Sequence, residues 1–289
     1  MGMVYLNSFT ILSREQEEKK LGAIRETCYT TLYPFNIFRY RNMTQLEFEP
    51  LTIFYGGNGS GKTTLLNIIA ERLHLSREAV FNRSNFFEDY VRACRYEMAF
   101  GEIAPPGSRI ITSDDVFDYL LDIRCINQGI DTERVKLFDQ YASDKYEPYQ
   151  LKSLEDYKEF KRKRDAKSKS RSKFVKERLM KNIREQSNGE SALYYFTNSI
   201  NENALYLLDE PENSLSATLQ LKLKSFLEDS VRFYRCQLII STHSPFLLSM
   251  QDAKIYDLDS DPIGVKSWTQ LENVRVYHSF FKEHEQEFI

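Results

Sequence analysis

Three short runs of the chain are almost continuously apolar, as strands buried on both faces of a sheet are. They lie at residues 51–55, 204–208 and 237–241. Apolar residues at helical spacing follow the first two runs, over residues 64–73 and 219–227. Buried strands that alternate with amphipathic helices are typical of a mostly parallel sheet with helices on both faces. The pattern therefore predicts an α/β fold.

The stretch between the two strand and helix pairs has a different pattern. Residues 112–115 resemble a capping box, and the apolar positions after them predict a helix. Residues 161–173 contain almost no apolar residue, which predicts an exposed loop or a mobile helix tip, and apolar periodicity resumes at Phe174. We therefore expect a helical insertion within an α/β core. The expected domains are a core of residues 1–75 and 187–289 and an insertion lobe of residues 76–186, with a basic tip at 161–173.

Composition and charge narrow the class of protein. Hydrophobic residues make up 42% of the chain and charged residues 28%, as in ordinary globular proteins. The sequence shows no signal peptide and no apolar run of the ~18 residues that a membrane span needs, so we expect a cytoplasmic protein without membrane contact. Four widely separated cysteines predict buried, reduced thiols. The net charge is −3, but residues 152–186 carry a local charge of +8, where an anionic partner would bind.

A glycine-rich segment, GGNGSGKT at residues 56–63, joins the first strand to the first helix. In such a loop the backbone N–H groups and the helix N-terminus bind phosphates, and glycines allow the close approach. The lysine of this motif reaches the β- and γ-phosphates, and the next hydroxyl binds Mg²⁺. A chance glycine turn is the alternative, but the strand and helix lie where the motif needs them. We therefore predict a site for ATP and Mg²⁺ made by Gly56, Asn58, Gly59, Ser60, Gly61, Lys62, Thr63 and Thr64.

Acidic and histidine side chains follow the other two buried strands. Asp209 and Glu210 end the second, and His243 follows the third. Such an acidic pair is often only a solvated turn, but beside the glycine loop Asp209 fits a residue that orients Mg²⁺, together with Thr63. Glu210 fits the general base that activates the attacking water. A histidine at this edge of the sheet is expected to contact the γ-phosphate or that water.

A polar segment, QSNGES at residues 186–191, precedes a further predicted helix. Taken locally, it reads as an ordinary helix N-cap with Ser187 capping and Glu190 at the third helical position. Its position, 22 residues before Asp209, favours a functional interpretation. Together these segments resemble, in order, the Walker A, signature, Walker B and switch histidine motifs of ABC-type ATPases. The chain is most similar to their RecF-, SMC- and OLD-like branch, which includes small stand-alone bacterial ATPases of the "AAA family".

The resemblance implies a P-loop NTPase fold with an ABC-type nucleotide-binding domain. It also implies a homodimer in the ATP state, in which Ser187, Gly189 and Glu190 would contact the nucleotide held by the partner. Three features depart from the family. The loop after the acidic pair ends in Ser216 and not in Asp. No glutamine lies between Thr64 and Ile126, where the family has one, and Asn85 is a weak substitute for it. The insertion is also too short for a long coiled coil.

These expectations support three functions. The first is an ATP-driven dimerising switch that acts on nucleic acid, through residues 161–173, or on a nuclease or other effector subunit, in DNA maintenance or anti-phage defence. The second is a non-hydrolysing nucleotide sensor or scaffold, which Ser216 and the missing glutamine make conceivable. The third is the ATPase subunit of a membrane transporter, which would need that glutamine and a signature ending in Gln. Residues 161–173 could equally form a solvated tip or meet an acidic protein.

Overall fold

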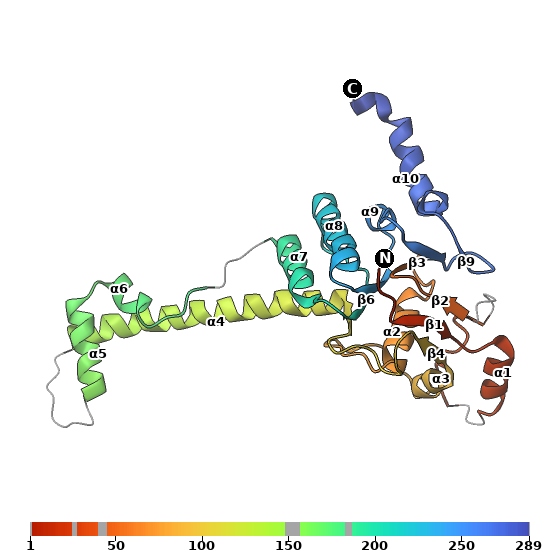
Figure 1. Ribbon diagram of the computed structural model, residues 1–289. Helices are drawn as coiled ribbons and strands as arrows, with labels where there is room; N and C mark the ends of the chain where they lie inside the picture. Colours follow the sequence, from red (N-terminus) through yellow and green to blue (C-terminus); the bar gives the residue numbers. More distant parts are fainter. Residues whose placement is uncertain (1, 25–27, 40–44, 148–156, 183–186, 289) are drawn as a thin grey trace. The chain divides into compact units, whose positions relative to one another are not determined.

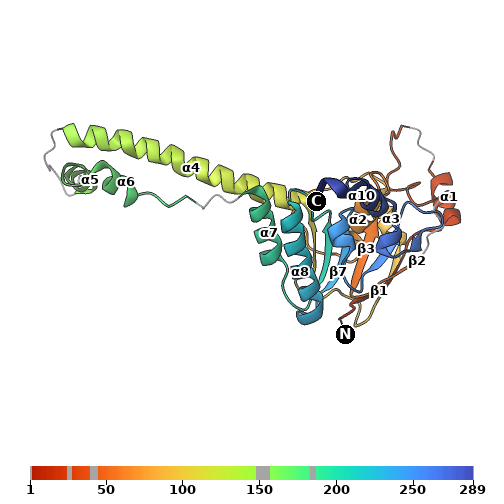
Figure 2. The ribbon, with the colours of Figure 1, turned by 90° about the horizontal axis from the view of Figure 1, so that it is seen from above.

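A computed structural model describes residues 2–24, 28–39, 45–147, 157–182 and 187–288. Within residues 157–182, side chains are described from residue 161 onward. Figures 1 and 2 show its ribbon from two directions. The chain forms two compact units, one of residues 1–117 and 188–289 and one of residues 118–187. The second unit therefore begins at residue 118 and not at 76, because the segment before it contributes a strand to the central sheet of the first unit.

The first unit is built on a six-stranded sheet of order β5-β6-β7-β3-β8-β9. All its neighbouring strands are parallel except β8 and β9. Every residue of β3, β6 and β7 is buried, which confirms the predicted mostly parallel α/β sheet. The strands are β3 (Leu51–Tyr55), β5 (Arg109–Thr112), β6 (Leu205–Asp209), β7 (Gln237–Ser241), β8 (Lys254–Asp257) and β9 (Gly264–Val265).

A second, antiparallel sheet of order β2-β1-β4 was not expected from the sequence. Its strands are β1 (Leu6–Thr10), β2 (Gln45–Glu47) and β4 (Arg95–Met98). The side chain of Gln237 at the start of β7 joins it to the central sheet. Its Oε1 accepts hydrogen bonds from the N–H groups of Tyr5 and Leu6, both at 2.8 Å, and its Nε2 donates to the Leu6 carbonyl at 2.9 Å. This fully buried amide thereby satisfies backbone groups that would otherwise lack partners.

Helices cover both faces of the central sheet. Helix α2 contacts β6 and β7, and its Leu65 and Ile68 share one apolar cluster with Leu205 and Ile239. Successive strand residues point to opposite faces, so Tyr206 and its alternating neighbours face the other side. Helix α8 contacts β7, and α7 packs against α8. The helices of this unit are α1 (Arg14–Gly22), α2 (Lys62–Arg72), α3 (Phe87–Ala93), α7 (Asn188–Ser199), α8 (Ala217–Phe233), α9 (Pro245–Leu248) and α10 (Glu272–Glu283), with 3₁₀ turns η1 (Trp268–Gln270) and η2 (Glu285–Phe288).

The second unit contains most of α4 (Ser113–Tyr146), together with α5 (Tyr157–Ser168) and α6 (Arg171–Lys176). Its apolar core is small and consists of Leu137, Tyr141, Ala166, Phe174 and Val175. The capping box predicted before α4 is confirmed, because the Thr112 N–H donates to Asp115 Oδ2 at 2.6 Å and the Asp115 N–H to Thr112 Oγ1 at 3.4 Å. None of the described helices is long and apolar enough to cross a membrane.

Two expectations for side-chain exposure were correct only in part. Residues 161–168 form part of α5, and Lys163 and Asp165 are only 7% and 8% exposed. They are buried because they form ion pairs, Lys163 with Glu147 at 2.9 Å and Asp165 with Arg178 at 2.8 Å. Of the four cysteines, Cys94 and Cys236 are buried as predicted. Cys28 and Cys125 are exposed, because Cys28 lies outside any helix or strand and Cys125 lies on an exposed side of α4.

Candidate functional site

The predicted motifs meet at one edge of the central sheet. The glycine loop follows β3, Asp209 ends β6, and His243 comes two residues after β7. The three strands are parallel neighbours, and Asp209 lies beside Ser241 in the register of β6 and β7. Because the carboxyl ends of parallel strands face the same edge, the fold brings these segments together. This edge is where open α/β sheets bind ligands.

Two glycines of the loop lie where a side chain does not fit. A Cβ atom on Gly56 would lie 2.5 Å from Ser60 Oγ. Gly61 has φ +94°, and a Cβ there would lie 2.8 Å from Ile37 Cγ2. Helix α2 begins at the next residue, so its first N–H groups open toward the loop. The loop therefore has the close backbone approach and the helix terminus that a phosphate requires.

Lys62 places a buried ammonium group beside the loop. Its Nζ donates to the carbonyls of Gly56 at 2.8 Å and Gly57 at 3.1 Å, and lies 3.6 Å from Glu210 Oε1. A cavity of about 550 Å³ opens here. Its lining is Asn36, Ile37, Asn58, Gly59, Ser60, Gly61, Lys62, Thr63, Thr64 and Glu210. The predicted phosphate-binding residues thus border one hollow, in which the lysine supplies positive charge.

Thr63 and Asp209 form an oxygen pair suited to Mg²⁺. The Thr63 hydroxyl donates to Asp209 Oδ1 at 3.1 Å, and the Ser241 hydroxyl donates to the same oxygen. Burial raises the pKa of the Asp209 carboxyl, and the neighbouring Glu210 carboxylate raises it further, while the two hydroxyl donors oppose the shift. A hydroxyl and a carboxylate are hard oxygen ligands of the kind that Mg²⁺ prefers. The pair has the chemistry of a magnesium site beside the cavity that the glycine loop borders.

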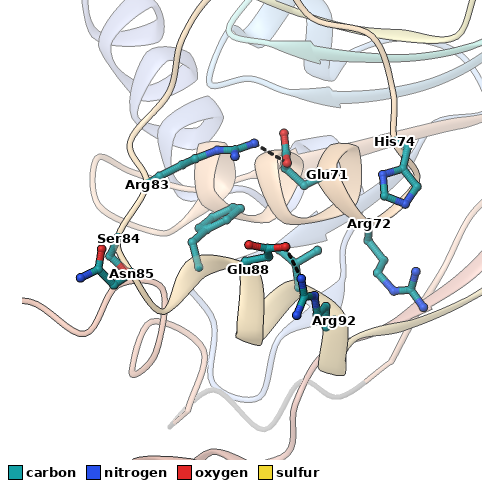
Figure 3. A pocket seen from close by; sticks show the side chains of 10 residues that line it. Glu71, Arg72, His74, Arg83, Ser84, Asn85, Glu88 and Arg92 are labelled. Carbon is teal, nitrogen blue, oxygen red and sulfur yellow. Dashed lines mark hydrogen bonds and ion pairs between the residues drawn. The ribbon is translucent and has the colours of Figure 1, made fainter.

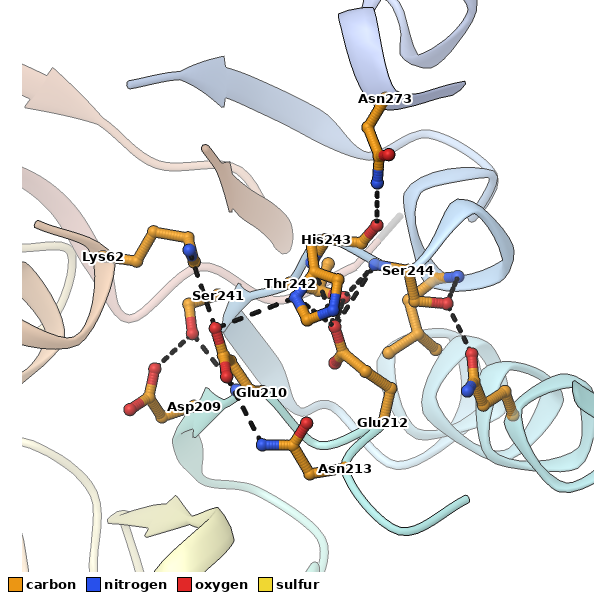
Figure 4. Close-up of polar contacts among 12 residues, drawn as sticks. Lys62, Asp209, Glu210, Glu212, Asn213, Ser241, Thr242, His243, Ser244 and Asn273 are labelled. Atoms are coloured by element: carbon orange, nitrogen blue, oxygen red, sulfur yellow. Dashed lines mark hydrogen bonds and ion pairs between the residues drawn. The ribbon is translucent and has the colours of Figure 1, made fainter. Parts of the chain in front are cut away.

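Glu210 lies on a strained turn directly after β6. Its φ is +47°, a left-handed conformation that is uncommon outside glycine, asparagine and aspartate. The Glu210 N–H donates to the Ser241 carbonyl at 3.0 Å, which ties the turn to β7. Asn213 Nδ2 donates to Glu210 Oε2 at 3.3 Å. The turn thereby directs a carboxylate toward Lys62, as Figure 4 shows.

Glu212 is a residue of the site that sequence reasoning missed. Its carboxylate is 5% exposed, and one oxygen, Oε1, accepts hydrogen bonds from the turn 242–244 that carries His243. His243 Nδ1 lies 3.4 Å from this oxygen and 3.8 Å from Glu210 Oε1. Asn273 in the first turn of α10 donates to the His243 carbonyl at 3.0 Å. Figure 4 shows the imidazole among these groups.

The signature residues occupy different positions in the structure. Gly189, in the first turn of α7, is buried, and a Cβ there would lie 3.1 Å from the Ser214 carbonyl and 2.7 Å from Leu219 Cδ1. Glu190 is exposed, and Ser187 is the last residue of the second unit. None of the three borders the loop cavity. Glu185 and Gln186, which also contribute to the resemblance, lie outside the described residues.

Three further residues near the loop belong to no motif recognised in the sequence, namely Asn36, Ile37 and Asp259. The Gly57 N–H donates to Asp259 Oδ2 at 2.6 Å, from the turn after β8. Asn36 and Ile37 line the cavity from the segment before β2. No periodicity or spacing could have identified these contacts, because they join residues that are far apart in the sequence.

Asn85, the substitute proposed for the missing glutamine, lies at a different cavity. This hollow of about 890 Å³ lies between α2 and α3 and is shown in Figure 3. Its lining includes two ion pairs, of Arg83 with Glu71 and, along α3, of Arg92 with Glu88. Asn85 does not border the loop cavity, so the structure gives it no place beside Lys62 and Asp209.

Comparisons with known protein families agree with the predicted motifs. A family described as "AAA domain, putative AbiEii toxin, Type IV TA system" matches residues 132–249, and a family described as "AAA domain" matches residues 33–71. The shorter match contains the glycine loop, and the longer one contains the signature, the acidic pair and His243. No protein with a curated function matches the chain.

Similar solved structures include the Smc head domain of Pyrococcus furiosus, with an extended coiled coil and bound to the C-terminal domain of ScpA. It is 14% identical, the match covers 96% of this chain and 100% of that chain, and the TM-score is 0.47. Another is a dimeric ATP-binding cassette in a post-hydrolysis state, bound to ADP and Pi. It is 14% identical, with 78% and 88% of the two chains covered and a TM-score of 0.38.

Two segments of the chain, residues 33–71 and 132–249, thus match AAA-domain families, in agreement with the ATP-binding P-loop core predicted from the motifs. The longer segment, 132–249, resembles the AbiEii-related AAA domains.

Proposed function

We propose that the protein binds and hydrolyses Mg-ATP and that ATP binding pairs two copies head to tail. The observation that carries this proposal is the meeting of Lys62, Asp209 and Glu210 at one sheet edge. The lysine Nζ lies 3.6 Å from Glu210 Oε1, and Asp209 is joined to the loop through Thr63. A phosphate cradle, a magnesium ligand pair and a carboxylate base are the parts that phosphoryl transfer to water requires.

Each residue has a defined task in this reaction. Lys62 exchanges its contacts with the loop carbonyls and Glu210 for the β- and γ-phosphate oxygens. Thr63 and Asp209 would hold Mg²⁺, which would neutralise phosphate charge. Glu210, released from the lysine, accepts a proton from the attacking water. His243 contacts the γ-phosphate or that water from the neighbouring turn.

The pairing of two copies accounts for the position of the signature. Ser187, Gly189 and Glu190 do not border the cavity of their own protomer, which is lined by the glycine loop, the start of α2 and Glu210. In a head-to-tail pair, the N-terminus of α7 of one copy would point its N–H groups at the γ-phosphate held by the other. Gly189 supports this role because it lets α7 lie directly against the Ser214 carbonyl.

Single-turnover hydrolysis and gel filtration of the full chain test the proposal. We expect Glu210→Gln to slow ATP cleavage by about 100-fold or more, because the base is lost, and to accumulate as a dimer with ATP and Mg²⁺. Glu228→Gln is a matched control, since Glu228 accepts one backbone N–H bond at 2.9 Å on the far end of α8. Cleavage that does not change in Glu210→Gln would remove Glu210 as the base, and a wild-type chain that binds ATP without cleaving it would instead support a nucleotide sensor. A variant that stays monomeric with ATP would contradict the pairing.

The second unit offers a surface for a polyanionic partner, for which we propose nucleic acid. Of the basic residues at 161–173, Arg162 bonds Asp144 at 2.6 and 3.1 Å, and Lys163 and Lys169 also pair with carboxylates. An exposed basic face remains on α5 and α6, made of Lys161, Lys167, Lys173, Lys176 and Arg164, whose guanidinium lies 3.9 Å from Asp165 but stays exposed. Three of these residues, Lys161, Arg164 and Lys167, follow one another at intervals of three along one side of α5. Exposed cations at helical spacing are suited to contact successive phosphates.

Charge reversal separates this interface from the internal ion pairs. Replacing Lys161, Arg164 and Lys167 by Glu is expected to abolish DNA or RNA binding and its salt dependence. The control replaces Arg162, Lys163 and Lys169, which is expected to destabilise the second unit. Binding that persists in the first variant across a salt series would remove nucleic acid as the partner and leave an acidic protein as the alternative.

The biological setting is proposed from the family match. Its description names a toxin of a toxin–antitoxin system, which is in line with a role in anti-phage defence. Among the described residues, no group of three or more His, Cys, Asp or Glu side chains could hold a metal ion. We therefore place any nucleic-acid cleavage in a nuclease or other effector subunit.

A further inference from the structure

The buried carboxylate of Glu212 holds the whole turn that carries His243. Its Oε1 accepts hydrogen bonds from Thr242 Oγ1 at 2.6 Å, from the His243 N–H at 3.0 Å and from the Ser244 N–H at 3.2 Å. Figure 4 shows this oxygen at the centre of the turn. One atom thus fixes three successive residues.

Local stability does not explain why this group is a carboxylate. The second oxygen, Oε2, is buried and has no hydrogen-bond partner among the described residues. A buried charged oxygen without a partner costs free energy. An amide would provide the same acceptor for the turn without the negative charge. The charge must therefore matter for something other than the backbone of the turn.

The negative charge faces the imidazole. His243 Nδ1 lies 3.4 Å from Glu212 Oε1, and the ring is 47% exposed, so packing alone does not fix its orientation. When Nδ1 faces a carboxylate, Nε2 is directed to the other side of the ring. A carboxylate behind a histidine commonly fixes its orientation and tautomer.

We propose that Glu212 is a positioning residue that fixes the turn and the ring of His243, so that Nε2 is presented to the nucleotide. The effect on catalysis rests on the proposed ATP hydrolysis, whereas the effect on the ring does not. The turn has a second support, since the Ser244 hydroxyl donates to Gln220 Oε1 at 2.6 Å and accepts from the Phe246 N–H at 3.2 Å. Loss of Glu212 is therefore expected to release His243 without unfolding the unit.

Histidine NMR tests the positioning without any need for activity. The chain has four histidines, so labelled imidazoles give few signals, and His243→Ala assigns the one of interest. We expect Glu212→Ala to shift and broaden the His243 signals and Glu212→Gln to shift them less. Asp115→Ala is the control, because Asp115 is also a buried carboxylate that accepts two backbone N–H bonds and a Thr hydroxyl bond. His243 signals that do not change in Glu212→Ala, or that change equally in Asp115→Ala, would overturn the proposal.

Kinetics then test the consequence for the reaction. Glu212→Ala is expected to lower kcat by between about 10- and 100-fold with little change in the KM for ATP, because the phosphate loop is untouched. In a His243→Ala background, the same change should cost less than about 3-fold more. Equal losses in both backgrounds would show that Glu212 does not act through His243. A wild-type chain without ATP cleavage would refute the proposed function, and the NMR result would still decide the positioning.

Discussion

Two glycines of the phosphate loop allow the strain of the backbone to be separated from the packing around it. Gly59 and Gly61 both have positive φ, +82° and +94°. A Cβ on Gly59 would meet no atom within 4 Å. On Gly61 it would lie 2.8 Å from Ile37 Cγ2 and 2.9 Å from Phe38 Cε1. Alanine at either position therefore adds the same strain, but only one position adds an overlap.

The expected magnitudes follow from these contacts. A left-handed conformation costs a non-glycine residue about 1–2 kcal/mol, so Gly59→Ala should lower the free energy of unfolding by about that amount. The Phe38 ring is 2% exposed and packed in the core, so it cannot move aside. Overpacking of this kind costs about 1–3 kcal/mol more, which gives about 2–5 kcal/mol for Gly61→Ala.

Urea unfolding measured by tryptophan fluorescence gives both values. The chain has one tryptophan, Trp268, which lies in the first unit and so reports on the unit that contains the loop. We also expect Gly61→Ala to bind a fluorescent ATP analogue more weakly than Gly59→Ala, because it displaces the wall of the cavity. Equal destabilisation by the two substitutions would refute the packing argument.

Three further predictions follow from burial and charge. Burial raises the pKa of the folded Asp209 carboxyl above its value in the unfolded chain, so the native state keeps this proton to higher pH. The stability that the protonated carboxyl contributes is therefore lost as the pH rises through its folded pKa. Thermal melting over a pH series should show that Asp209→Asn lacks this decline. Burial also raises the pKa of the Cys94 thiol to about 12 and of the Cys236 thiol to about 11. Mass spectrometry after alkylation near pH 7.5 should therefore find Cys28 and Cys125 modified in the native protein, and the buried pair only after unfolding. Asp144→Asn should destabilise the second unit by about 1–3 kcal/mol in circular-dichroism melts, because it removes the charged partner of Arg162.

The parts of the fold that the sequence predicted are those with local signals. Strands β3, β6 and β7 are continuous apolar runs because both their faces are covered. Lys62 and Thr63 have a fixed spacing from the glycines, because one loop must wrap one phosphate. The start of α4 was predicted correctly, because the side chains of Thr112 and Asp115, three residues apart, each accept a hydrogen bond from the other's backbone N–H.

The parts that were missed depend on contacts between distant segments. Glu212 meets the turn of His243 from 30 to 32 residues away, and Gly57 meets Asp259 across 202 residues. The basic stretch was misjudged for the same reason. Its charges look solvated in sequence, whereas Arg162 finds Asp144 on α4, 18 residues earlier. Composition shows charges but not their partners.

The order of the strands has a consequence for how this protein can be cut or rebuilt. Neighbouring strands β5 and β6 come from opposite sides of the 118–187 segment. The N-terminal piece holds the phosphate loop but not the acidic pair, and the C-terminal piece holds the reverse. Neither piece alone is a minimal ATPase. A trimmed version would need residue 117 spliced to residue 188, and two fragments expressed together should be active only if they recombine into one sheet.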